Sequence, residues 1–168
     1  MLYMETINII IFEYLLGYCL QSFAVVLGIY NFNKQRLVLK DYILASVLVT
    51  IISCFVRLLL MSFGIHVIIN IMFVYVICVI LLKMPAYVSV RSALLVMVII
   101  LICEMVVTAI TTIFIGVDNF NNLLKDPLQK SYVGVLANIL FSIVMSLQYY
   151  LFMKKGEKNR SISTKDSE

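Results

Sequence analysis

The sequence predicts an all-α membrane protein in which about five transmembrane helices form one bundle. Of its 168 residues, 63% are hydrophobic and only 13% are charged, and the mean hydropathy is +1.06. A water-soluble fold needs a polar surface that such a composition cannot supply. Most of the chain falls into apolar runs about as long as the roughly 20 residues that cross a hydrocarbon layer of about 30 Å. We therefore expect no separate soluble domain.

The first apolar run covers about residues 7–30 and predicts a transmembrane helix that is retained. The run is longer than the apolar core of a signal peptide, and no basic segment precedes it. Lys34, Arg36 and Lys40 follow it, as expected for the cytoplasmic end of a span.

The second and third runs, about residues 42–63 and 65–82, predict an antiparallel helical hairpin with a tight turn at Gly64. Pro85 closes the third helix, because proline has no N–H for the helical ladder. The fourth run, about residues 88–115, is long enough to cross the bilayer at a tilt.

The end of the chain alternates between polar and apolar segments. Residues 116–131 predict a short helix at the membrane interface, ended by Pro127. The fifth run, about residues 132–153, completes a five-helix transmembrane domain over residues 1–153. The polar, basic segment 154–168 predicts a disordered cytoplasmic tail.

The distribution of basic residues predicts the orientation, because Lys and Arg near span ends are retained in the cytoplasm. Of thirteen, two fall on the opposite side, Lys125 and Lys130, and Arg57 lies within a span. The other ten fall on one side: Lys34, Arg36, Lys40, Lys83, Arg91, Lys154, Lys155, Lys158, Arg160 and Lys165. This predicts a multi-pass protein of the cell membrane, with its N-terminus outside and its C-terminus inside.

Polar residues within the spans are the candidates for a functional site, since an ionisable group at a span centre costs about 2.5 to 3.5 kcal/mol. With the predicted orientation, each span carries one strongly polar residue in its outer half. These are Glu13, Arg57, Asn70, Glu104 and Asn138, and His66 lies near the outer end of the third span. We interpret the six as a ligand-binding or switching site.

The charges of this set are unbalanced, because Glu13 and Glu104 face one guanidinium, that of Arg57. A buried excess charge is unstable. Either one carboxyl is protonated, or a cation such as a ligand amine, a metal ion or protonated His66 completes the site. A purely structural ionic lock, with His66 as an ordinary interfacial residue, is the alternative.

Small and polar residues at helical spacing predict packing faces on four of the spans, because small side chains let membrane helices approach closely. The faces are Glu13, Gly17, Gln21, Ala24 and Gly28 on the first span; Ser46, Thr50, Ser53 and Arg57 on the second; Glu104, Thr108 and Thr111 on the fourth; and Gly134, Asn138, Ser142 and Ser146 on the fifth.

Motifs for catalysis, cofactors or nucleic-acid binding do not occur in the sequence. It contains no glycine-rich phosphate loop, no HExxH helix and no nucleophile elbow. Cys19, Cys54, Cys78 and Cys103 lie in separate apolar runs, which predicts small core residues and no metal site. The basic clusters lack interleaved aromatics, so cytoplasmic anchoring explains them better than nucleic acid does. We expect a protein that is not an enzyme and has no cofactor.

Four segments resemble a known family. FEYLLGY contains Glu13, VRLLLMSFGIHVIINI contains Arg57 and His66, CEMV contains Glu104, and NNLLKDPLQKSYVG precedes the last span. Together they resemble the membrane sensor region of clostridial sensor histidine kinases of the accessory-gene-regulator type, whose catalytic part is a GHKL ATPase. The resemblance implies a bundle that perceives an extracellular signal, often a peptide, and passes it to a kinase.

No ATP-binding module follows the last span, so the resemblance implies either signalling through a separate kinase or another membrane protein, or a truncated relic of such a kinase. The sequence thus favours a non-catalytic sensor or regulator in the lipid bilayer. Two alternatives stay open. One is a small-solute transport component, either a substrate-binding subunit or a proton-coupled carrier, although no internal repeat supports it. The other is an accessory factor for another membrane protein.

Overall fold

The computed structural model describes residues 17–59 and 65–165, with side chains at residues 17–56, 69–126 and 129–154. The described residues form six α-helices and no strand. In chain order the helices are α2 (Cys19–Phe32), α3 (Leu39–Leu59), α4 (Ile65–Ile80), α5 (Ala86–Ile115), α6 (Val117–Leu123) and α7 (Pro127–Lys165).

Three helices are long and apolar enough to cross a membrane, as judged by their length and composition. They contain the segments Leu39–Val56, Ala86–Ile115 and Gln129–Lys154. Three of the five predicted spans are therefore present as long apolar helices. The apolar parts of α2 and α4, Cys19–Phe32 and Ile69–Ile80, are shorter. The predicted turn at Gly64 lies outside the described residues.

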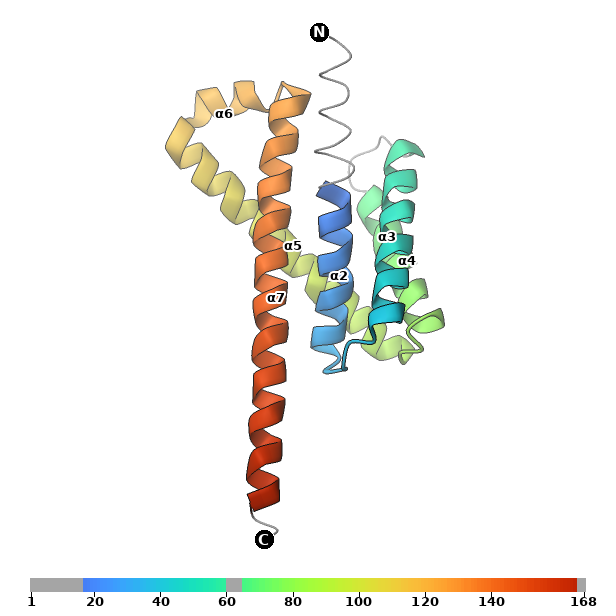
Figure 1. Cartoon of the computed structure of the whole chain (residues 1–168). Coiled ribbons are helices and arrows are strands. Elements are labelled where there is room, and N and C mark those ends of the chain that lie inside the picture. The colour runs from blue at the N-terminus through green and yellow to red at the C-terminus, as the bar shows by residue number, and fades with distance from the viewer. Residues whose placement is uncertain (1–16, 60–64, 166–168) are drawn as a thin grey trace.

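Helix α2 is the centre of the bundle. It packs against α3, α5 and α7 (Figure 1), and each of its residues is buried or half-buried. Small side chains allow this approach: a β-carbon on Gly28 would lie 2.8 Å from Val96 Cγ2 of α5 and 2.9 Å from Met145 Sδ of α7. The predicted packing faces of the first and second spans agree, because Ala24, Gly28 and Ser46 are buried.

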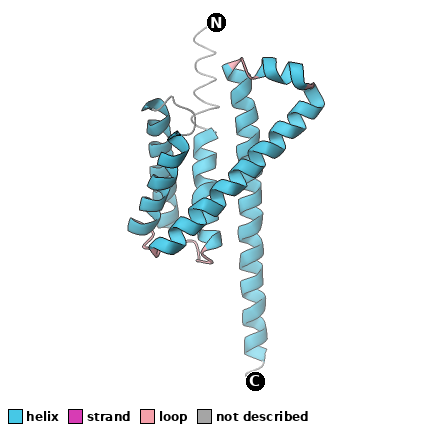
Figure 2. Cartoon of the chain, turned by 180° about the vertical axis from the view of Figure 1, so that it is seen from behind, coloured by secondary structure: helices cyan, strands magenta, loops and turns pink. Residues whose placement is uncertain are grey.

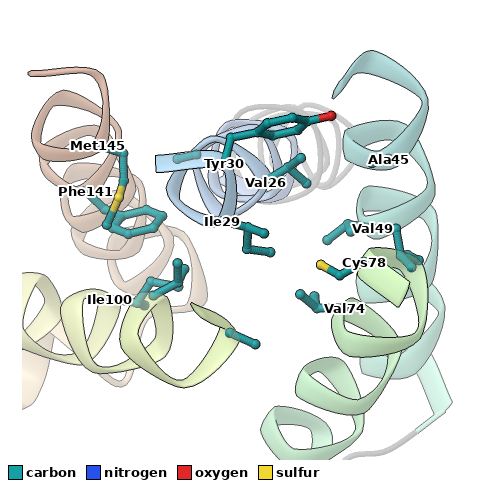
Figure 3. Close-up of a cluster of buried hydrophobic side chains, with 14 of the residues drawn as sticks. Val26, Ile29, Tyr30, Ala45, Val49, Val74, Cys78, Ile100, Phe141 and Met145 are labelled. Carbon is teal, nitrogen blue, oxygen red and sulfur yellow. The ribbon is translucent and has the colours of Figure 1, made fainter. Parts of the chain in front are cut away.

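The core lies where α2 meets α3, α4, α5 and α7. Ile29 of α2 is fully buried among residues of the other helices, including Val74 and Cys78 of α4, Ile100 of α5, and Phe141 and Met145 of α7 (Figure 3). Inside a membrane such contacts stabilise the bundle by close packing and dispersion, since lipid is as apolar as the side chains.

Helix α5 crosses the bundle obliquely (Figures 1 and 2). Its first half packs on the other helices through small residues, including Ser89 and Ser92, which are both buried. Its second half diverges, and Glu104 and Thr108 are exposed there. The predicted packing face through Glu104 and Thr108 is therefore wrong in the described structure: the spacing identified one face of the helix, but the tilt removes it from the bundle.

Two features near α7 differ from the sequence predictions. Pro127 begins α7 and does not end a helix; the short helix before it, α6, ends at Leu123. Proline suits the first position of a helix, where no N–H bond is needed. At the other end α7 continues to Lys165, where we had expected disorder. Lys, Glu and Arg are good helix formers, and extending an existing helix requires no new nucleus.

Two lysines have left-handed backbone conformations at helix ends. Lys34, with φ of 52°, follows α2, and Lys83, with φ of 51°, follows α4. After α2, Lys34 N–H bonds the Asn31 carbonyl at 3.0 Å and Gln35 N–H bonds the Tyr30 carbonyl at 3.1 Å, the hydrogen bonds of a Schellman motif. A side chain in this conformation is strained by about 1 kcal/mol, which glycine avoids.

Lys34→Gly and Lys83→Gly are therefore each expected to raise the free energy of unfolding by about 0.5 to 1 kcal/mol. The gain does not exceed the relieved backbone strain, because glycine also has more conformational freedom in the unfolded chain. Reversible unfolding in mixed micelles measures the change. Lys40→Gly, in the first turn of α3, is the control and should lower stability. If all three variants were less stable than the wild type, backbone strain at Lys34 and Lys83 would be contradicted.

Candidate ligand site

A cavity of about 70 Å³ lies among α2, α3, α4 and α5. Every one of these helices contributes residues to its wall. They are Gln21, Ser22 and Val25 of α2; Val49 and Ser53 of α3; Asn70, Ile71 and Val74 of α4; and Ala93, Val96, Met97 and Ile100 of α5. Because a buried water needs roughly 10 to 15 Å³ on this measure, the cavity has room for a few waters or a small organic group.

The helical repeat explains how four apolar helices form a partly polar wall. On α5 the lining residues Ala93, Val96, Met97 and Ile100 follow the spacing i, i+3, i+4, i+7 of one helix face. Asn70 and Val74 of α4 are separated by four residues, as are Val49 and Ser53 of α3. Each helix thus turns one face towards the cavity, and the wall on α5 is apolar.

The polar part of the wall comes from three helices. Gln21 of α2, Ser53 of α3 and Asn70 of α4 carry amide or hydroxyl groups, and no charged residue contributes to the wall formed by the described residues. Neutral groups that both donate and accept hydrogen bonds favour a neutral, polar ligand group. A charged group would be poorly solvated here.

Asn70 is the polar group most clearly available to a ligand. Its Oδ1 atom is buried and accepts no hydrogen bond from the residues that the structure describes. An unsatisfied buried acceptor costs about 1 to 3 kcal/mol. A donor that enters the cavity and reaches this oxygen recovers part of that cost.

The structure places the other predicted site residues differently. Asn138 of α7 is not part of the wall, and its Nδ2 donates a hydrogen bond to the Gly17 carbonyl at 3.1 Å. Glu104 is exposed on α5, beyond the cavity-lining residues. Of the six candidates, Asn70 alone lines the cavity that the described residues form.

The structure does not describe the side chains of the other three candidates. Glu13 lies outside the described residues, as do the side chains of Arg57 and His66, whose backbones belong to α3 and α4. The convergence of Glu13, Arg57 and Glu104 therefore stays a prediction. Gln21 and Ser53 were not among the six, although both belong to predicted packing faces, and that spacing is the signal that could have identified them.

Metal binding has no support in the described part of the chain. No group of three or more His, Cys, Asp or Glu side chains lies together there. The four cysteines are free; Cys78 and Cys103 are buried, whereas Cys19 and Cys54 are half-buried.

The helices define the class of the molecule as a membrane protein. The outward faces of α3, α4 and α5 expose large apolar side chains; Phe114, for example, is 85% exposed. Soluble proteins rarely expose apolar surface on this scale, whereas lipid covers it without cost. Comparison with protein-family models, curated proteins and solved structures gives no match for this chain.

The two asparagines should respond differently to replacement by leucine. Asn70→Leu removes an unsatisfied acceptor, so the free energy of unfolding should stay the same or rise by about 1 kcal/mol. Asn138→Leu removes the hydrogen bond to the Gly17 carbonyl, just before α2, and should lower the free energy of unfolding by about 1 kcal/mol. Unfolding in mixed micelles compares them. Equal losses would mean that Asn70 has a bonding role in the folded state.

Proposed function

We propose that the chain is a non-catalytic, multi-pass sensor of the cell membrane that binds a small neutral ligand, or one neutral side chain of a peptide, in the cavity. The observation that carries the proposal is the meeting of Gln21, Ser53 and Asn70, with the unbonded Asn70 Oδ1, around this space. An ordinary packing defect would be apolar, whereas polar groups from three helices provide specificity.

A route from the cavity to α7 supports sensing. Gln21 belongs to the cavity wall and to α2, and α2 packs on α7 at two levels. At one level, just before α2 begins, Asn138 donates a hydrogen bond to the Gly17 carbonyl. At the other, a β-carbon added to Gly28 would lie 2.9 Å from Met145 Sδ, so the two helices approach closely there. A ligand that favours one position of α2 therefore changes the position of α7 as well. Transmission requires the ligand to bind one bundle arrangement more tightly than another.

The charge distribution supports five spans with the N-terminus outside. The α2–α3 and α4–α5 connections lie at one end of the bundle, and α6 lies at the other (Figure 1). Lys34, Arg36 and Lys83 belong to the first end. Near α6 lie two basic residues, Lys125 and Lys130. The positive-inside rule favours the first end as the cytoplasmic one.

The resemblance to kinase sensor regions supports a separate partner. Helix α7 extends to Lys165, beyond the apolar segment that ends at Lys154, and could carry movement to a cytoplasmic kinase or to another membrane protein. The extracellular signal would then be a peptide with a small neutral side chain, or a free small molecule.

Ligand-induced thermal stabilisation tests the proposal. Purified protein in nanodiscs is mixed with one probe at a time. The probes are peptides secreted by the cells that naturally make the protein, and small amides and alcohols. We expect at least one probe to raise the unfolding temperature of the wild type and of Asn138→Leu, but not of Asn70→Leu. Asn138→Leu is the matched control, since it removes an amide from another part of the bundle. A shift retained in Asn70→Leu would exclude the cavity as the binding site.

Uptake by vesicles separates sensing from transport. A sensor should bind the active probe without accumulating it, whereas a carrier should concentrate it inside sealed vesicles. Accumulation above that of protein-free vesicles would replace the sensor proposal with the transport alternative.

A further inference from the structure

A hydrogen-bonded cluster ties together the two connections at the basic end of the bundle. Asn33, just after α2, donates from Nδ2 to Met84 Sδ of the α4–α5 connection at 2.8 Å. Ser92 of α5 donates from Oγ to Asn33 Oδ1 at 2.6 Å. Met84 and Ser92 are both buried. These three residues fix the relative positions of three chain segments at one corner.

A cation stands next to each member of the cluster. Lys34 follows Asn33, Lys83 precedes Met84 and Arg91 precedes Ser92, and all three cations are exposed. Consecutive Cα atoms are about 3.8 Å apart, so the cluster holds the Cα atoms of the three basic residues at the same corner. We define Lys34, Lys83 and Arg91 as the basic corner.

The backbone gives a second sign of a special role. Two of the three cations, Lys34 and Lys83, occupy left-handed positions that glycine or asparagine would fill with less strain. Strain of this kind is retained mainly where a side chain is needed for function. At both positions the residue is instead a long cation.

Exposed apolar and aromatic residues occur in the same chain segments as the basic corner, at the end of the α2–α3 connection and in the first turns of α3 and α5. Val38 and Leu39 follow the α2–α3 connection, and Tyr87 lies in the first turn of α5. Tyrosine beside Lys and Arg is typical of the interface between lipid headgroups and hydrocarbon. Asp41, in the first turn of α3, is the one acidic residue in the sequence between residues 17 and 103, so the positive charge is largely uncompensated there.

We propose that the basic corner binds the phosphate of an anionic phospholipid, with the acyl chains along the exposed apolar residues. Arg91 supplies a planar guanidinium and the two lysines supply point charges, which together suit a phosphate. A soluble phosphate would gain nothing from Val38, Leu39 and Tyr87, and these neighbours select a lipid. The inference is independent of the ligand cavity.

Lipid titration of the full chain tests this site. The protein is placed in phosphatidylcholine nanodiscs containing increasing fractions of phosphatidylglycerol, and the unfolding temperature is recorded. The test variant combines Lys34→Gly, Lys83→Gly and Arg91→Gln; glycine removes each lysine charge without new backbone strain. The control combines Arg36→Gln, Lys40→Gln and Lys154→Gln, which removes the same charge from the same end of the molecule.

We expect phosphatidylglycerol to raise the unfolding temperature of the wild type. Each cation at the surface contributes about fivefold in affinity, so the test variant should need on the order of 100-fold more lipid for half the effect. The control should need clearly less additional lipid than the test variant, because its cations are not expected to contact the phosphate directly. Equal losses in the two variants, or no loss in either, would overturn a discrete site. An equal rise with inorganic phosphate alone would also overturn it, in favour of a soluble anion.

Discussion

Gly28→Val should lower the free energy of unfolding by about 3 kcal/mol, the largest single effect that we expect in the bundle. The added β-carbon would lie within 3 Å of Val96 Cγ2 and of Met145 Sδ. Met145 can change rotamer, but Val96 is branched at Cβ and has little freedom on its helix. The substitution therefore forces α2 away from α5 or α7. Reversible unfolding in mixed micelles measures the loss.

Gly134 provides a matched control for this prediction. It is also a helical glycine, on α7, but a β-carbon there would meet no atom within 4 Å. Gly134→Ala should raise stability by about 0.5 to 1 kcal/mol, because alanine is the better helix former. Gly28→Ala should instead lower it. Equal gains for the two alanine variants would contradict the close approach of α2, α5 and α7.

Phe141→Ala should lower the free energy of unfolding by about 2 kcal/mol. Phe141 is only 1% exposed and packs with Ile29, Ile100 and Met145 where α2, α5 and α7 meet (Figure 3). In soluble proteins this truncation costs about 3 to 5 kcal/mol. Part of that cost is transfer from water, which is absent when the unfolded helices stay in lipid. The loss of packing contacts remains.

Phe114→Ala is the control, because Phe114 is exposed on the diverging half of α5. The same unfolding measurement should show a change of less than about 0.5 kcal/mol. If removing Phe114 costs as much as removing Phe141, then the outer half of α5 is packed in the membrane and α5 does not diverge as described.

Long apolar runs were the reliable part of the sequence prediction. They correctly identified α3, α5 and α7, because a membrane requires about 20 apolar residues and a helix that bonds its own backbone. Pro127 was misinterpreted because proline stops a helix from within but suits its first turn. The path of α5 could not be predicted, since its tilt depends on packing against other helices.

The candidate site was predicted only in part. Asn70 was identified because amides are rare in apolar helices, and it lines the cavity. Glu104 was identified as an ionisable residue within a span, but it is exposed on the second half of α5. Depth along a helix can be read from sequence, whereas the direction of a face depends on its neighbours. The packing-face spacing included Gln21 and Ser53, but which residues of those faces border a cavity depends on the neighbouring helices.

Cross-linking between α3 and α4 tests most directly whether polar side chains from separate helices meet around one cavity. In a chain with its four native cysteines replaced by alanine, cysteines are introduced at Ser53 and Asn70. A short bifunctional maleimide should join them within one molecule. The matched pair at Phe55 and Met72, both exposed on the same helices, should stay unlinked. Efficient linking of the exposed pair, with none at Ser53 and Asn70, would contradict the proposed cavity.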